Sequence, residues 1–124
     1  MPGVKDSLQP GIENVLEVTV TPEMSPPHLP VKVLSTPSMV QLMEQTCLLS
    51  AAPHLDETET TVGTHICVSH VAAATAGEDV VVTTKLVEVV KRRLRFEVSV
   101  KAGDRLLGEG THDRAVIDTT RFAS

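Results

Sequence analysis

The sequence predicts an α+β protein in which one long buried helix is wrapped by a curved antiparallel sheet of about five strands. Three observations support this prediction. Residues 37–52 contain no glycine and are apolar on nearly every side, which is typical of a buried helix. The segments before and after them are rich in β-branched residues, which favour strands. Glycine-containing turns separate the later segments, and such short turns connect antiparallel neighbours.

The first part of the chain is expected to contain little regular structure. Residues 1–12 hold two prolines and two glycines, so we expect a loose arm there. Residues 14–20 are rich in valine and predict the first strand. Four prolines within residues 21–30 exclude a helix interior and a central strand, and they predict a stiff, extended connection. A short extended piece is expected at residues 32–34.

The helix and four further strands complete the predicted fold. Thr36 followed by Pro37 predicts the helix start, with Thr36 as its N-cap, and Pro53 predicts its end. The short Gly-Asp loop after residue 102 makes the last two strands a hairpin. The four strands are expected at residues 61–71, 79–90, 93–101 and 105–118.

This order of elements is that of the hot-dog architecture, in which a curved antiparallel sheet wraps one long helix. We interpret residues 1–124 as a single hot-dog domain. A sheet of this kind leaves an edge exposed, and pairing with a second copy covers that edge. We therefore expect a homodimer.

Composition excludes several classes of function. The chain has 16 acidic and 11 basic residues and a net charge of -5, which argues against nucleic acid as a partner. It has no apolar run long enough to span a bilayer and no apolar signal core, so we expect a cytoplasmic protein that does not enter the membrane. Cys47 and Cys67 lie in apolar runs without metal-binding spacing, which predicts buried free thiols. No histidine pair has metal-ligand spacing either, so we expect no metal.

Three residues are candidates for chemistry. Thr36 lies at the predicted helix start, where the helix dipole favours an anion, although a capping hydroxyl is usually engaged by backbone N–H groups. Glu44 is the only charged residue of the predicted helix, so it either reaches solvent at the helix edge or lies in a pocket. His70 ends the row of even-numbered residues that predicts the inward face of its strand. A hydrogen-bonded core histidine is the alternative there to a catalytic base.

A glycine and a basic cluster are candidates for binding. Gly63 interrupts a β-branched strand, and such a glycine often marks the close approach of a ligand or of another backbone. The only dense basic cluster contains Arg92 and Arg93. Arginine suits phosphate groups, although the cluster also fits the solvated end of a hairpin.

Several of these segments together resemble the fluoroacetyl-CoA thioesterase family. The resemblance covers about residues 31–122. It is carried by the helix start, by the glycine-containing strand that runs into His70 and two alanines, and by two motifs in the last two strands. The motifs read STPSMVQLME at residues 35–44, TVGTHICVSHVAA at 61–73, RRL at 92–94 and GEGTHDRAVI at 108–117.

The resemblance implies a homodimeric hot-dog enzyme that hydrolyses an acyl-CoA thioester. The reacting set that it implies is Thr36, Glu44 and His70. No cofactor is expected, because CoA is part of the substrate. Gly63 falls where the family's backbone approaches the acyl group, and the basic cluster is expected to contact the phosphates of CoA. The expected substrate-binding residues are Gly63, Arg92, Arg93 and Arg114.

The mechanistic hypothesis is that Glu44 attacks the thioester carbonyl or activates water, while Thr36 positions the reacting group and His70 acts as general base and acid. Residues 26–30 (PPHLP) stand where the family member that selects fluoroacetyl-CoA has a lid with phenylalanines. We therefore expect a short- or medium-chain acyl-CoA as the substrate. The alternatives are a non-catalytic acyl-CoA binding module and a structural dimer in which Glu44 and His70 are paired core groups.

Overall fold

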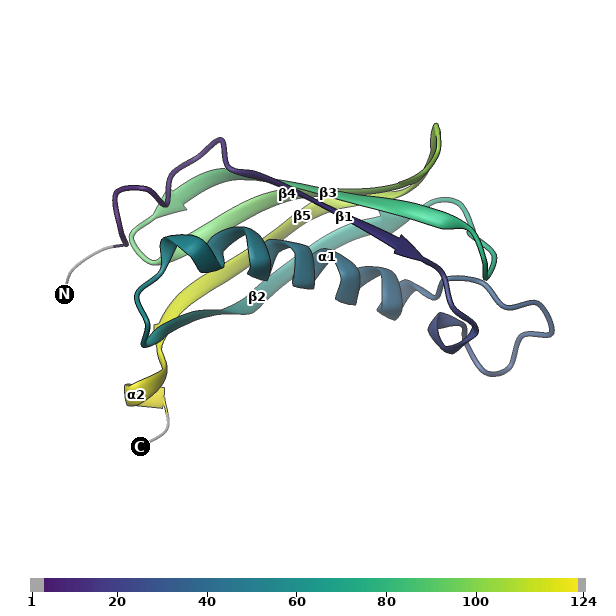
Figure 1. The fold of residues 1–124 in the computed structure, drawn as a ribbon, viewed down its shortest axis with the longest axis horizontal. Coiled ribbons are helices and arrows are strands. Elements are labelled where there is room, and N and C mark those ends of the chain that lie inside the picture. Colours follow the sequence, from purple (N-terminus) through teal and green to yellow (C-terminus); the bar gives the residue numbers. More distant parts are fainter. Residues whose placement is uncertain (1–3, 123–124) are drawn as a thin grey trace.

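A long helix packs against one face of a curved, five-stranded antiparallel sheet in the computed structural model, which describes residues 4–122 (Figure 1). The strand order is β1-β3-β4-β5-β2, so β1 and β2 form the two edges. The predicted fold class is therefore confirmed. The strands are β1 (Glu13–Thr19), β2 (Glu59–His70), β3 (Asp79–Val90), β4 (Arg93–Ala102) and β5 (Arg105–Asp118).

The helix α1 (Thr36–Ala51) begins one residue earlier than predicted. Its N-cap is Ser35, whose Oγ accepts a hydrogen bond of 3.2 Å from the N–H of Ser38. The prediction that Thr36 caps the helix is therefore wrong, and the hydroxyl of Thr36 is left for other partners. Within the described residues, no helix is both long enough and apolar enough to cross a membrane.

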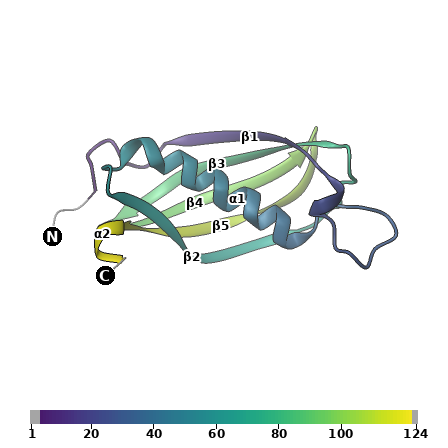
Figure 2. The ribbon, with the colours of Figure 1, turned by 60° about the horizontal axis from the view of Figure 1, so that its bottom comes forward.

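The core of the described residues is mostly aliphatic. On α1, Met39, Met43 and Cys47 are fully buried, and Phe96 of β4 lies in the same core cluster. Figure 2 shows α1 crossing the sheet obliquely between its two edges. The other side of the helix is uncovered, and Leu49 is 47% exposed. The helix is thus buried on one side rather than all round, because within this chain no second layer covers its other side.

Strand β2 is irregular near its middle. Its pairing with β5 shifts register between Gly63 and His65, which marks a β-bulge. Ahead of the bulge Thr61 is buried, whereas beyond it His70 is turned toward α1 and contacts Thr36. After the bulge, the even-numbered residues face α1, as predicted. Before the bulge, the odd-numbered residues face α1 instead, so the prediction is wrong by one residue there.

Residues 4–12 lie against the rest of the fold rather than forming the expected loose arm. Leu8 is 2% exposed, and the N–H of Gly11 donates to the carbonyl oxygen of Leu86 at 2.8 Å. Burial of the apolar side chain thus fixes a segment whose prolines and glycines suggested an irregular arm. Residues 1–3 lie outside the described part of the chain.

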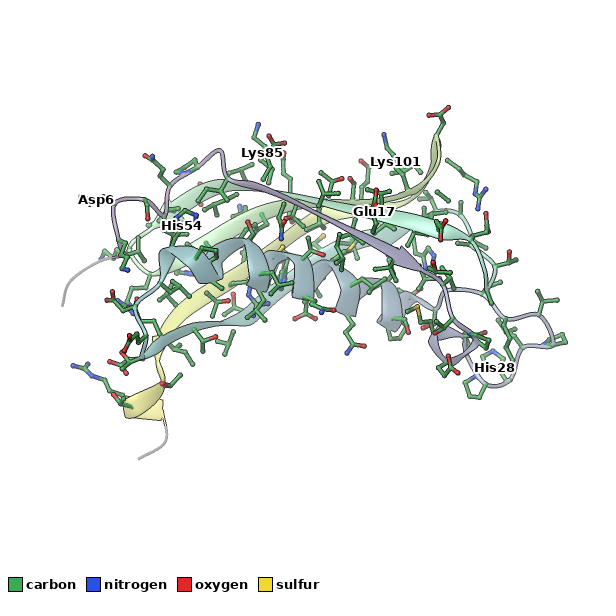
Figure 3. The ribbon with its side chains drawn as sticks, in the orientation of Figure 1. Asp6, Glu17, His28, His54, Lys85 and Lys101 are labelled. Atoms are coloured by element: carbon green, nitrogen blue, oxygen red, sulfur yellow. The ribbon has the colours of Figure 1, made fainter. Side chains whose placement is uncertain are left out.

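The proline-rich connection between β1 and α1 lies at one end of the molecule. It contains a 3-10 turn, η1 (Pro22–Met24), and Val33 pairs with Thr75, which confirms the short extended piece. Figure 3 shows His28 of this connection at the opposite end from His54, which lies in the 3-10 turn η2 (Ala52–His54) after α1. The two loop histidines are therefore far from each other.

The two cysteines have different environments. Cys47 on α1 is buried, as predicted, and this burial raises the pKa of its thiol to about 12. Cys67 is exposed, so the prediction that it is buried is wrong. The reason is that β2 is an edge strand, whose residues 63–67 are all exposed.

A maleimide at about pH 8 is expected to label Cys67 and to spare Cys47, because the Cys47 thiol is covered and stays protonated. Mass spectrometry of the native protein should show one label per chain, and two after unfolding in guanidinium chloride. The Cys67→Ser variant is the control and should take up no label while folded. Labelling of Cys47 in that folded variant, at the rate of an exposed thiol, would contradict its burial.

Candidate active site

Thr36 and His70 meet where α1 begins and β2 ends. The Oγ1 of Thr36 lies 2.8 Å from Nδ1 of His70, which is hydrogen-bond distance. Two local features place them there. Ser35 caps the helix and leaves the Thr36 hydroxyl available, and His70 is the last residue of β2. The structure thus brings together two of the three residues predicted to react.

The two ring nitrogens of His70 have different surroundings. Nδ1 faces Thr36, whereas Nε2 is buried and has no hydrogen-bond partner within residues 4–122. When Nε2 carries the ring proton, Nδ1 has a lone pair that accepts the hydroxyl proton of Thr36. A hydroxyl that donates to an imidazole is the arrangement of a nucleophile with its base.

A mostly apolar groove adjoins the Thr36–His70 pair. Besides this pair it is lined by Ser35 and by proline, valine, leucine and alanine, and none of its lining residues is acidic, lysine or arginine. Such walls suit an uncharged, apolar ligand group. The apolar lining residues are Pro26, Val33, Leu34, Val71, Ala72 and Ala73.

Glu44 lies apart from this pair, in the middle of α1. Its side chain is 41% exposed, and Oε1 is 3.8 Å from Nη1 of Arg114 and 3.9 Å from Nε2 of His112. It also faces Gly63, where a Cβ atom would lie only 2.8 Å from Oε1. The close approach that is expected at Gly63 is therefore made, within this chain, by the Glu44 carboxylate.

Two buried polar residues of β5 lie behind Glu44. Arg114 is 6% exposed and His112 is 1% exposed. Burial lowers the pKa of His112 below that of an exposed histidine. Arg114 was predicted as a substrate-binding residue, but His112 was given no role. The alternation along β5, which puts His112 and Arg114 on the same face, is the signal that could have found it.

The three predicted reacting residues thus occupy two separate places in this chain. Thr36 and Glu44 are eight residues apart on α1, which corresponds to about 12 Å along the helix axis. His70 contacts Thr36 and Glu44 lies near His112 and Arg114, so Glu44 and His70 do not form a core pair within this chain. Their roles in a reaction remain predictions.

The basic cluster lies at the turn between β3 and β4. Arg92 donates to Oε2 of Glu59 at 2.6 Å and to the carbonyl oxygen of Val116 at 3.1 Å, while Arg93 is exposed. Contact with CoA phosphates stays a prediction for both arginines. Across residues 4–122, no group of three or more histidine, cysteine, aspartate or glutamate residues is placed to hold a metal ion.

Comparison with known proteins identifies relatives over most of the chain. Residues 14–120 match the fluoroacetyl-CoA-specific thioesterase family. A fluoroacetyl-CoA thioesterase of Streptantibioticus cattleyicolor is 45% identical over 91 residues, which are 73% of this chain and 66% (slightly under two thirds) of that protein.

Solved structures agree with the fold. A fluoroacetyl-CoA thioesterase is 37% identical with a TM-score of 0.89, covering 95% of this chain and 94% of that one. A hot-dog-like protein of Thermanaerovibrio acidaminovorans is 20% identical with a TM-score of 0.85, covering 92% of this chain and 87% of that one. At that identity the second structure supports the fold alone.

The free energy of unfolding is expected to fall as the pH is lowered from about 7 to about 5, partly because of His112. Burial lowers the pKa of His112 in the folded state. As the pH falls, the unfolded chain therefore binds this proton first, near pH 6.5. The free energy of unfolding then decreases with falling pH until the folded state also binds the proton at His112. Urea unfolding over this pH range measures the effect. The matched variant His112→Gln should show a smaller slope, and an identical slope would contradict the assignment.

Proposed function

We propose that this chain, which belongs to the fluoroacetyl-CoA-specific thioesterase family, hydrolyses an acyl-CoA thioester to a free acid and CoA. The observation that carries the proposal is the 2.8 Å contact between the Thr36 hydroxyl and His70. The reaction needs only water besides the acyl-CoA, so no cofactor is proposed. A cytoplasmic location is part of the proposal, and the two free cysteines are consistent with it.

The contact supports a two-step reaction centred on Thr36. In the first step, Nδ1 of His70 takes the hydroxyl proton while Oγ1 of Thr36 attacks the thioester carbonyl. The C–S bond then breaks, CoA leaves as a thiol with that proton, and the acyl group becomes an ester of Thr36. In the second step, His70 takes a proton from an attacking water, and this proton returns to Thr36 as the acid leaves. The N-terminal dipole of α1 favours the oxyanion in both steps.

A role for Glu44 in this reaction needs a second protomer. The middle of β2 is an exposed edge, and the predicted homodimer would cover it by antiparallel pairing of the two β2 strands. A two-fold axis near Ile66 would set His70 of one protomer close to the partner's Gly63. The partner's Glu44, which faces that glycine, would then lie beside the Thr36–His70 pair.

Each site of such a dimer is composite. One protomer supplies Thr36 and His70, and the other supplies Glu44 and Arg114. Glu44 is then placed to orient the water of the second step by accepting a hydrogen bond from it while His70 takes the other proton, and Arg114 is placed to bind the acyl-CoA. This arrangement makes use of all the residues that the resemblance assigns to the reaction, although one protomer keeps them in two places.

The groove supports a short- or medium-chain acyl group as the substrate. Its walls are mostly proline, valine, leucine and alanine, which suit an uncharged acyl chain. The proline-rich connection contributes Pro26 to the groove and no aromatic ring. A phenylalanine lid over the acyl group is therefore absent from residues 26–30, and selection for fluoroacetyl-CoA is not part of the proposal.

Thr36→Ala and His70→Ala are each expected to lower kcat about 10²- to 10⁴-fold, because each removes half of the nucleophile–base pair. Thr36→Ser, which keeps a hydroxyl, should retain measurable turnover. The assay is thiol release across acyl-CoA substrates of increasing chain length. The control Ser38→Ala removes a hydroxyl from the same helical turn and should keep the wild-type rate. Wild-type rates for Thr36→Ala would overturn the mechanism, and tight binding without any thiol release would favour the non-catalytic module.

Mixing two inactive variants tests the composite site. In a heterodimer of Thr36→Ala with Glu44→Gln, one site contains both substitutions and the other contains neither. Equal mixing and subunit exchange should therefore restore about a quarter of the wild-type activity, since about half of the dimers are mixed and each has one intact site. The control mixture, Thr36→Ala with His70→Ala, should stay inactive because both residues come from the same protomer. No recovery in the first mixture would place the whole site in one protomer.

A further inference from the structure

The guanidinium of Arg114 is held on three of its nitrogens. Nε donates to Oγ1 of Thr61 at 2.8 Å, and Nη2 donates to the carbonyl oxygen of Thr61 at 2.9 Å. Nη1 lies 3.1 Å from Nε2 of His112. Thr61 holds one edge of the planar fork, and His112 adds the anchor on Nη1, the nitrogen that faces Glu44 at 3.8 Å.

The contacts of His112 select one form of its ring. Nδ1 lies 2.8 Å from the carbonyl oxygen of His65, and a carbonyl oxygen only accepts, so Nδ1 carries the proton. Arginine only donates, so Nε2 must offer a lone pair to Nη1 of Arg114. A ring that satisfies both contacts is neutral, with its hydrogen on Nδ1. A protonated ring would turn an N–H toward the N–H of a cation.

We propose that His112 is a positioning residue that, in its neutral Nδ1–H form, aims Nη1 of Arg114 at the substrate side of the site. Nη1 of Arg114 then presents its second N–H to the space beside Glu44 and Gly63, and an oxygen of the acyl-CoA accepts it there. His112 itself touches no substrate, because it is 1% exposed. This inference rests on the proposed function and deepens it by naming what orients the binding arginine.

The charged groups around His112 have opposite effects on the pKa of its ring. Arg114 on β5 disfavours protonation of the ring, whereas Glu44 on α1 and Asp113 on β5 favour it. From β2 the backbone carbonyl of His65 accepts a hydrogen bond from Nδ1, which also favours protonation of the ring. Burial is the largest influence and lowers the pKa of His112. The acceptor that Arg114 needs is therefore kept at neutral pH and is lost in acid.

The kinetic test compares two substitutions at position 112. His112→Leu fills the space without an acceptor and should raise KM about tenfold or more, as the loss of a hydrogen bond to a charged group implies. His112→Gln keeps an amide oxygen for Nη1 of Arg114 and should stay within about threefold of the wild-type KM. Val82→Ala on β3, a fully buried apolar position, controls for loss of stability. An unchanged KM in His112→Leu, or a KM that rises equally in Val82→Ala at matched thermal stability, would overturn the proposal.

Two further readouts keep the test decisive if the leucine variant does not fold. Between about pH 7 and pH 5, KM should rise more steeply in the wild type than in His112→Gln, which has no ring to protonate. Nitrogen-15 chemical shifts of the His112 ring should report a proton on Nδ1 and none on Nε2 at neutral pH. The opposite tautomer would refute the inference whatever the activity. A wild-type protein that releases no thiol would instead refute the proposed function, and the tautomer would still be readable.

Discussion

The close approach of the Met39 side chain of α1 and of the backbone of β2 to Gly108 on β5 is the constraint on which the rest of the structure depends. A Cβ atom at Gly108 would lie 2.6 Å from Sδ of Met39 on the helix and 2.8 Å from the carbonyl oxygen of Ser69 on β2. Side chains do not fit at such distances, so this point of β5 requires glycine. Gly108 is also the cross-strand neighbour of His70. The missing side chain lets the end of β2 and the start of α1 approach until Thr36 reaches His70.

Strand β5 also separates the polar interior from the outer face of the sheet. His112 and Arg114 point inward and are buried, whereas Asp113 between them pairs with Arg95 at 2.8 Å on the other face. The hydrogen bond from Arg95 lowers the pKa of Asp113. Figure 3 shows Lys85 and Lys101 pointing away from α1 on that outer side. The sheet thus holds the guanidinium of Arg114 on its inner face, while lysines such as Lys85 and Lys101 extend into solvent on its outer face.

Much of this architecture could be predicted because its signals are local. The strands, the helix and the turns follow from residues within each segment, and Thr36, Glu44 and His70 were each identified by position. The remaining features depend on contacts between segments. Ser35 displaces Thr36 as the cap because its Oγ meets the N–H of Ser38. The importance of His112 is visible only once β2 supplies a carbonyl on one side of its ring and Arg114 lies on the other.

The bulge in β2 has a consequence for how this chain tolerates changes of length. Gly63 and His70 both face α1, yet they are separated by an odd number of positions. In a regular strand an odd separation would put them on opposite faces, and the extra residue at the bulge corrects the parity. Deleting one residue there would keep β2 paired with β5 and would make the hydrogen-bond ladder between the two strands more regular. It would also turn either the glycine or the histidine outward, so a change that the sheet accepts would remove one end of the site.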